Sequence, residues 1–386
     1  MRVLNLASLT LAAISGIEAR AGIDIRVQGG SAKNTAGAVF AMTNEPTGNR
    51  VIAFSRNGDG SLTQTKAYLT GGLGQGVDFD TQGGLQLDAK NKYLYAVNPA
   101  DDLITVFAVD GSSLTKIQTI YGGDQPLSIT LSKKGYAYSL TGSVASTGIF
   151  GFKVDDKTGK LSPLTNETIP LSTPIGVPGV VAFAPDGRSL IVTNKVGSTI
   201  DVFSIDEKGQ ASSAPVTTMA SSGLRPFGAV FNNESTLYVV ESGLPAFKNS
   251  ALSTYHLNDG KVPSLTAVTK AERSDQTDAC WVVVTPDNRY AYTANFVSNS
   301  ISSYAIFNNG TTSLIEGEAA LPGDGSEPVD LALSSDGMYL YNLLRGSGAV
   351  VAYKIKEDGS LQQVGEMFGK GMGLMPGLGN SGLAAF

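Results

Sequence analysis

A short pattern that recurs seven times constrains this chain more than any other feature. It consists of an aliphatic residue, two variable residues, and then Phe or Tyr. Successive copies are spaced 45 to 53 residues apart, a length that holds about four short strands with their turns. The copies are Val51–Phe54, Ile104–Phe107, Ile149–Phe152, Ile200–Phe203, Leu252–Tyr255, Ile301–Tyr304 and Val350–Tyr353. We therefore expect seven equivalent units rather than a sandwich of two sheets.

Each unit has the same internal order of strands and turns. An apolar strand rich in small residues, such as Gly179–Phe183, precedes an aromatic-rich strand such as Tyr290–Tyr292. Turns such as Pro185–Arg188 join the two, and their Asp-Gly pairs accept the positive φ angles that hairpins need. A second turn, as in Asp358–Leu361, introduces a more polar strand suited to an outer edge. This order predicts an all-β, seven-bladed β-propeller with four-stranded antiparallel blades.

The two ends of the repeat region complement each other. The first unit begins directly at its second strand, Ala38–Met42, and lacks an inner strand. The chain ends in Ser381–Phe386, which reads as an inner strand with no blade after it. We expect this C-terminal strand to pair with Val39–Met42 and complete blade one, which removes a free sheet edge.

The N-terminus has the features of a signal peptide. Arg2 precedes a mostly apolar run over Val3–Ile17, and Ala19–Ala21 matches the small-x-small cleavage pattern. We expect a signal peptide at 1–21, an N-terminal leader at 22–36 and the propeller at 37–386. The protein is then expected to be secreted, with cell-wall association as a further option. The candidate glycosylation sites are Asn166, Asn233 and Asn309.

Charge and cysteine content narrow the classes of partner. The net charge is −6, and Lys and Arg are scattered, which argues against a nucleic-acid or anionic membrane surface. Cys280 is the single cysteine, so an intrachain disulfide framework is excluded. No Asp-x-Asp-x-Asp-Gly run is present, and we expect no metal and no cofactor.

The repeated turns and strands resemble a known family. Pro-Asp-Gly-Arg-type turns followed by strands like Tyr290–Asn295, and Asp-Gly-Ser-Leu after the third strand, are similar to the lactonase-type propellers over roughly residues 37–386. That family includes 6-phosphogluconolactonases and fungal carboxymuconate cyclases. The resemblance implies a site at the end of the central channel where inner strands begin, built around an Arg-His pair. The corresponding start positions here contain neither residue: Gly83, Leu127, Gly179, Phe227, Cys280, Val329 and Gly382.

Polar residues nevertheless gather at that end, where inner strands start and second strands end. Arg225 and Glu241 could form a carboxylate clamp with a proton acceptor, and Asp278 is a further candidate base. The candidate ligand-binding residues are Asn98, Asn194, Lys195, Gln276, Trp281, Asn295 and Arg345. Structural alternatives stay open, because Arg225–Glu241 could be a surface ion pair and strand-end Asn residues often cap turns.

For three further residues, a structural role competes with a catalytic or ligand-binding one. The only histidine, His256, follows a third-strand aromatic residue far out on a blade, and we expect it to face solvent. Cys280 has no histidine near it in the pattern and reads as a small buried residue. Trp281 could be a platform for a ring-shaped ligand or a wedge between two blades.

Two functions remain open. The first is a lactonase or lactonising isomerase, in which Arg225 and Lys195 bind a carboxylate and Glu241 or Asp278 is the base. The second is a non-catalytic secreted or cell-wall binding propeller. Arg225 and Glu241 converging in an open channel would favour the enzyme, whereas a channel plugged by Phe227 and Trp281 would favour the binding protein. We expect a monomer whose partner is a small carboxylate or lactone.

Overall fold

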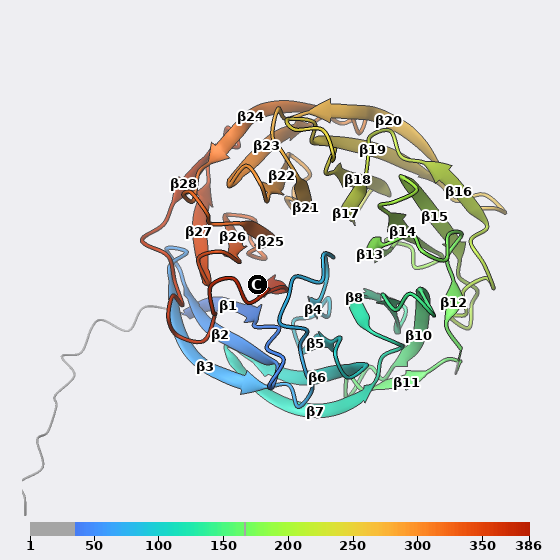
Figure 1. Cartoon of the computed structure of the whole chain (residues 1–386), viewed down its shortest axis with the longest axis horizontal. Helices are drawn as coiled ribbons and strands as arrows, with labels where there is room; N and C mark the ends of the chain where they lie inside the picture. The colour runs from blue at the N-terminus through green and yellow to red at the C-terminus, as the bar shows by residue number, and fades with distance from the viewer. Residues whose placement is uncertain (1–34, 166) are drawn as a thin grey trace, which may run out of the picture. The chain divides into compact units, whose positions relative to one another are not determined.

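The computed structural model describes residues 35–165 and 167–386, and their regular structure consists of strands. These strands form seven antiparallel sheets around a common axis (Figure 1). The predicted seven-bladed β-propeller with four-stranded blades is confirmed. In the described part of the chain, no helix is long and apolar enough to cross a membrane. The predicted signal peptide at 1–21, residues 22–34 of the leader and Asn166 lie outside the described residues.

The two strands nearest the axis alternate in direction. The inner strands of blades one to seven are β29 (Leu383–Ala385), β4 (Leu85–Leu87), β8 (Pro126–Ser132), β13 (Pro178–Phe183), β17 (Pro226–Phe231), β21 (Ala279–Val284) and β25 (Pro328–Leu333). The second strands are β1 (Thr35–Met42), β5 (Tyr93–Asn98), β9 (Tyr136–Thr141), β14 (Ser189–Asn194), β18 (Thr236–Glu241), β22 (Tyr290–Asn295) and β26 (Tyr339–Leu344). Because paired strands are antiparallel, inner strands begin where second strands end.

The outer half of each blade carries the recurrent aromatic pattern. The third strands are β2 (Arg50–Asn57), β6 (Leu103–Asp110), β10 (Gly148–Val154), β15 (Thr199–Ser204), β19 (Ala251–Asn258), β23 (Ser300–Ile306) and β27 (Ala349–Ile355). The fourth strands are β3 (Leu62–Leu69), β7 (Ser113–Tyr121), β11 (Leu161–Pro163), β16 (Thr217–Ala220), β20 (Ser264–Arg273), β24 (Thr312–Ala320) and β28 (Leu361–Gln363), and β12 (Ile169–Pro170) also pairs with β10. All seven pattern aromatics are nearly or fully buried, so the repeat marks the packing between blades.

Tyrosine hydroxyls join each of several blades to the next one. The Tyr95 hydroxyl donates to the Gly159 carbonyl in the turn of the following blade at 2.8 Å. Tyr341 of blade seven makes the same bond to Gly60 of blade one at 3.1 Å. Such a bond satisfies a buried phenol at little cost. The aromatic second strands and the glycine-containing turns between third and fourth strands are thus two halves of one contact.

The C-terminal strand closes the ring as predicted. β29 pairs with β1 through Val39↔Ala385 and its neighbours. The Phe386 N–H donates to the Ala38 carbonyl at 3.0 Å, and the Met42 N–H donates to the Gly382 carbonyl at 2.9 Å. The end of the chain thus supplies the inner strand that blade one lacks, and the ring is closed between blades seven and one.

The segment between β3 and β4 crosses the centre of the ring (Figure 1). The Gln82 side chain accepts from the Val282 N–H at 3.1 Å and donates to the Val282 carbonyl at 3.0 Å. The backbone N–H of Gln82 donates to the Gly179 carbonyl of blade four at 2.9 Å. A Cβ on Gly228 would lie 2.0 Å from the Gln82 amide oxygen, so glycine is required there. A cavity of about 270 Å³ lies against Gln82, lined by β8, β13 and β17.

Neither channel geometry set out from the sequence is therefore observed. Gln82 occupies the centre, whereas Phe227 and Trp281 pack on each other with ring centroids 5.1 Å apart. Both rings are almost fully buried among apolar residues of blades five to seven. Trp281 is thus a wedge between blades, the structural alternative considered for it.

Candidate active site

Five residues immediately before inner strands adopt the left-handed backbone conformation. They are Gln125, Val177, Arg225, Asp278 and Glu327, with φ between 47° and 60°. Each carbonyl accepts a hydrogen bond from the N–H of the first residue after the second strand of its own blade, at 2.9 to 3.2 Å. This conformation costs a non-glycine residue about 1 kcal/mol or more, and such residues concentrate at functional sites. The repeated turn places all five at the end of the ring where inner strands begin.

We call the charged part of this end the channel mouth. It comprises residues 78–82, Lys195, Arg225, Asp278, Glu327 and Arg345. The segment 78–82 leads into the central Gln82, so its carboxylates lie among cations contributed by other blades. The predicted gathering of polar residues at this end is therefore present in the structure.

Two of the three cations of the channel mouth are held by carboxylates. The Lys195 ammonium donates to the Asp80 carboxylate, 2.5 Å away, and lies 4.3 Å from the Phe227 ring centroid. The Arg345 guanidinium donates to Glu327 at 2.8 Å and to Asp78 at 3.4 Å. The Lys195 side chain is 1% exposed, whereas that of Asp80 is 46% exposed, so a buried ammonium is held by a carboxylate that still reaches solvent. Because both cations are already paired, neither is free to bind a substrate carboxylate, which is the role that the sequence suggested for Lys195.

Arg225 and Asp278 form the remaining part of the channel mouth. Arg225 is half-buried, its Nε atom is buried without a partner, and no ion pair to it is found in the described residues. Asp278 is half-buried too, and burial raises the pKa of its carboxyl, while hydrogen bonding from Cys280 and the charge of Arg225 lower it. The two residues together offer a base beside a cation that could receive an anion.

Glu241 is not the partner of Arg225. Its carboxylate accepts from the Ser221 hydroxyl and the Ser253 hydroxyl, both at 2.8 Å, and from the Gly223 N–H at 2.9 Å. The side chain is fully buried, and burial raises the pKa of Glu241. A general base has to reach the substrate, so this geometry assigns Glu241 to holding the segment 221–223 that leads to Arg225.

The candidate amides differ in what they contact. Asn98 donates to the Thr105 hydroxyl at 3.1 Å, and Asn295 donates to the Ser300 and Ser302 hydroxyls at 2.9 and 2.8 Å. Gln276 accepts from the Ser300 hydroxyl at 2.9 Å. Asn194, in contrast, has both amide atoms buried without a hydrogen-bond partner. The side chains of Asn98, Asn295 and Gln276 thus make hydrogen bonds within the protein, whereas the Asn194 amide, next to Lys195 in the sequence, makes none.

Cys280 and His256 lie as the sequence suggested. Cys280 is 3% exposed, with its sulfur 3.4 Å from an Asp278 carboxylate oxygen. Burial raises the pKa of the Cys280 thiol well above its ordinary value, which disfavours a thiolate nucleophile. His256 is exposed on the third strand of blade five. The described residues contain no group of three or more His, Cys, Asp or Glu side chains that could hold a metal ion.

A carboxyl group beneath the channel mouth joins the closing strand to blade seven. Asp330 is 3% exposed and accepts from the Gly382 N–H at 2.7 Å and from the Ser381 hydroxyl at 3.4 Å. Burial, helped by the nearby charge of Asp78 and opposed by the Gly382 N–H, raises the pKa of Asp330 to about 7.

Asp330→Asn should change how stability depends on pH. A folded-state pKa above the unfolded value means that the folded chain binds the proton more tightly, so the free energy of unfolding falls as pH rises from about 4 to about 7. The amide keeps an acceptor for Gly382 but cannot ionise. We expect the variant to gain about 2 kcal/mol relative to the native chain at about pH 8, and less at about pH 5. Urea unfolding at the two pH values measures this, and parallel pH profiles of the two proteins would refute it.

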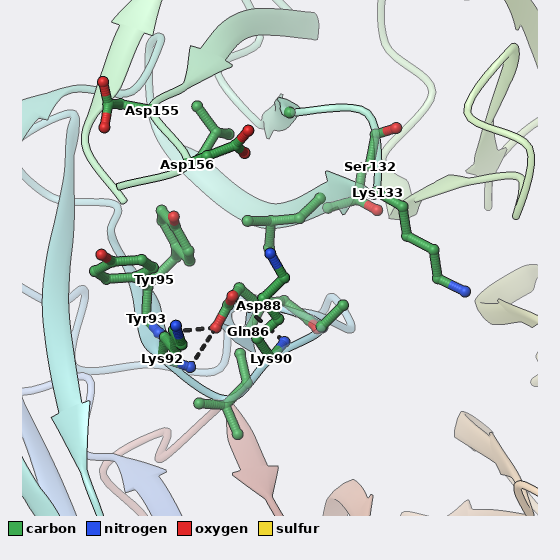
Figure 2. A pocket seen from close by; sticks show the side chains of 16 residues that line it. Gln86, Asp88, Lys90, Lys92, Tyr93, Tyr95, Ser132, Lys133, Asp155 and Asp156 are labelled. Atoms are coloured by element: carbon green, nitrogen blue, oxygen red, sulfur yellow. Dashed lines mark hydrogen bonds between the residues drawn. The ribbon is translucent and has the colours of Figure 1, made fainter. Parts of the chain in front are cut away.

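A separate cavity of about 290 Å³ lies at the opposite end of the ring, between blades two and three. Figure 2 shows it beside Asp88, whose carboxylate accepts from the N–H groups of Lys92 and Tyr93. A similar cavity of about 540 Å³ lies between blades six and seven, lined by Asp287, Arg289 and their neighbours. Because cavities of this kind are found at two junctions where wedge-shaped blades diverge, we attribute them to the fold and not to a ligand.

Asn233 and Asn309, two of the predicted glycosylation sites, are exposed in turns. The Asn309 side-chain oxygen accepts from the Thr311 hydroxyl at 2.7 Å, within its own sequon. Glycosylation at these positions stays a prediction.

Comparison with known proteins places this geometry in context. A family model described as "Lactonase, 7-bladed beta-propeller" matches residues 34–183 and 227–331. The chain is 25% identical over 276 residues to the 6-phosphogluconolactonase of Pectobacterium atrosepticum, which covers 69% of this chain and 78% of that protein. It is 24% identical over 257 residues to the 6-phosphogluconolactonase of Formosa agariphila, with coverages of 61% and 70%.

Solved structures share the fold at lower identity. The periplasmic gluconolactonase of Pseudomonas aeruginosa superposes with a TM-score of 0.70 at 15% identity, over 90% of this chain and 98% of that one. A protein from Lactobacillus plantarum superposes with a TM-score of 0.70 at 16% identity, with coverages of 90% and 98%. The residues matched by the family model include Glu241 and Asp278 but not Lys195 and Arg225.

Proposed function

Because the chain belongs to the lactonase family of seven-bladed β-propellers, we propose that it hydrolyses a small lactone at the channel mouth. Asp278 is the general base and Arg225 binds the developing anion. The observation that carries the proposal is that a half-buried carboxyl with a raised pKa lies beside a guanidinium without an ion-pair partner in the described chain. Lactone chemistry is further supported by similarity to proteins named 6-phosphogluconolactonase.

The reaction requires one water molecule and no further co-reactant. The Asp278 carboxylate takes a proton from water as the oxygen attacks the lactone carbonyl, and the resulting oxyanion lies against Arg225. The ring C–O bond then breaks, and the proton held by Asp278 passes to the departing alkoxide. The product is a hydroxy acid. Its carboxyl group releases to solvent the remaining proton of the attacking water, and the resulting carboxylate stays paired with Arg225.

Other charged residues position this pair. Lys195 and Arg345 hold the segment 78–82 through Asp80 and Asp78, and Glu241 holds the segment that precedes Arg225. Left-handed backbone at Arg225 and Asp278 is part of the same arrangement. The proposed location is outside the cell, supported by the signal-peptide features of residues 1–21.

A lactone panel tests the proposal with Arg225→Gln as the diagnostic variant. We expect the native chain to open at least one lactone faster than the uncatalysed rate. The variant should lose about 100-fold in kcat/KM, since a charge-assisted contact to the oxyanion is removed. Arg188→Gln is the matched control, because Arg188 pairs with Asp186 and Asp259 in exposed turns at the other end of the ring. No turnover across the panel, or equal rates for Arg225→Gln and the native chain, would contradict the proposal.

A further inference from the structure

The charge balance of the channel mouth limits which lactones it can hold. Lys195 and Arg345 are paired with carboxylates, so Arg225 is the one cation of the mouth without an ion pair in the described residues. A phosphate monoester carries about two negative charges at neutral pH, whereas one guanidinium matches one carboxylate. Asp80 is held at this end by Lys195, and Asp278 lies at the start of the next inner strand after that of Arg225. The negative charge of Asp278, which has no ion-pair partner in the described residues, would repel a dianion.

Exposed aliphatic side chains flank these charges. Val177, Val196 and Leu224 are 48%, 65% and 51% exposed. The Lys195 N–H donates to the Val177 carbonyl at 3.2 Å, so Val177 and Val196 lie on adjoining turns. The Arg225 N–H donates to the Ser198 hydroxyl at 3.1 Å, which brings Leu224 to the same place. Aliphatic surface around a single unpaired cation suits a ligand with an apolar part.

A cavity of about 350 Å³ adjoins Leu224 between blades four and five, which gives such a part room. Its lining mixes the apolar Ala220, Ala251 and Ala271 with polar residues such as Ser221, Ser222 and Asn249. Arg273 also lines this cavity, but it ends the outermost strand β20, whereas Arg225 precedes the innermost strand β17 (Figure 1). The backbone of these two residues thus lies at opposite edges of blade five.

We propose that the substrate is an unphosphorylated lactone with at most one negative charge and an alkyl or aryl substituent. The substituent lies against Val177, Val196 and Leu224 and extends into the adjoining cavity. This inference rests on the proposed function for the lactone itself. It goes beyond that function by excluding the phosphorylated sugar lactones, after which the curated relatives are named.

Kinetics with three substrates test the specificity. We expect kcat/KM for δ-decanolactone to exceed that for δ-valerolactone by at least about tenfold, because several methylene groups leave water. The 6-phosphogluconolactone should be hydrolysed at the uncatalysed rate. Val196→Ser and Leu224→Ser should lower the ratio of the two alkyl-lactone values, while Arg188→Gln should not change it. Preference for the phosphorylated lactone, or a ratio near one, would overturn the inference.

Calorimetry of the hydroxy-acid products separates this inference from the proposed function. We expect 5-hydroxydecanoate to bind, Arg225→Gln to weaken it, and 6-phosphogluconate not to bind. If 5-hydroxydecanoate binds in this way but no lactone is hydrolysed, the specificity of the site stands and the proposed activity fails. Tighter binding of 6-phosphogluconate, weakened by Arg273→Gln, would place a phosphate in the cavity and overturn the inference. Binding of neither product would overturn it as well.

Discussion

Deletion of Leu383–Phe386 is expected to destabilise the protein by at least about 4 kcal/mol, because backbone pairing and apolar burial are lost together. Without β29, the inner edge of β1 is exposed: the N–H and C=O groups of Ala38 lose their Phe386 partners, and the pairing of Val39–Ala41 with β29 is lost. The Arg56 guanidinium also loses the Phe386 carbonyl, to which it donates at 3.0 Å. The effect is large because β29 is the inner strand of blade one, and without it β1 has no hydrogen-bonded strand on the side that faces the axis.

Urea unfolding and hydrogen exchange measure this effect. In the deletion variant, the amides of β1 should exchange faster than those of β14 in blade four, which is three blades away from blade one around the ring. Phe386→Ala is the matched control, because it keeps the backbone pairing and removes one half-buried ring. We expect the control to lose less than half as much stability. Equal stability of the deletion variant and the native chain would mean that the ring does not depend on its C-terminus.

Asp278→Asn is expected to lower kcat/KM for lactone hydrolysis by about 100- to 10,000-fold, the usual range for loss of a general base. The amide is nearly isosteric and keeps an oxygen near the Cys280 sulfur, now 3.4 Å from the carboxylate. Folding should therefore be little affected, and thermal unfolding checks this. Asp259→Asn, at an exposed turn of the opposite end, is the control for removal of one negative charge.

The pH profile identifies Asp278 as the base more sharply than a single rate. The carboxyl acts in its ionised form, and burial raises its pKa above the ordinary range. We therefore expect kcat/KM to rise with pH through this raised pKa and then level off. Arg225→Gln removes a charge that lowers the pKa of Asp278, so the rise should move to higher pH in that variant. An unmoved profile would indicate that another group titrates.

The architecture could be predicted because each blade corresponds to one repeat of the same local sequence pattern. The seven aliphatic-x-x-aromatic patterns lie in third strands whose aromatics are buried between blades. The glycine-containing turns between third and fourth strands also supply the carbonyls that tyrosines such as Tyr95 and Tyr341 bind. The unpaired first and last strands predicted their own pairing, because a strand edge without a partner is unfavourable. The family resemblance was likewise carried by these turns.

The candidate site was predicted only in part. Arg225, Asp278, Lys195 and Arg345 do lie at one end of the ring, since strand direction alone decides that. The sequence could not show which of these side chains form ion pairs, because the partners can come from different blades. Lys195 of blade four, for example, binds Asp80, which precedes the inner strand of blade two. The recurrent X-Pro before inner strands, as in Arg225-Pro226, was the available signal for the left-handed turns.

Local sequence thus specifies the blades and their number, since strand propensity and turn chemistry act between neighbours along the chain. It also predicts the closure, because the first repeat lacks the inner strand that the end of the chain supplies. Contacts across the axis had to come from the folded ring. Gln82 reaches Val282, 200 positions away in the chain, and occupies the channel that the sequence left either open or filled by Phe227 and Trp281. The burial of Glu241 and the freedom of Arg225 follow from the same long-range packing, which no spacing within one repeat encodes.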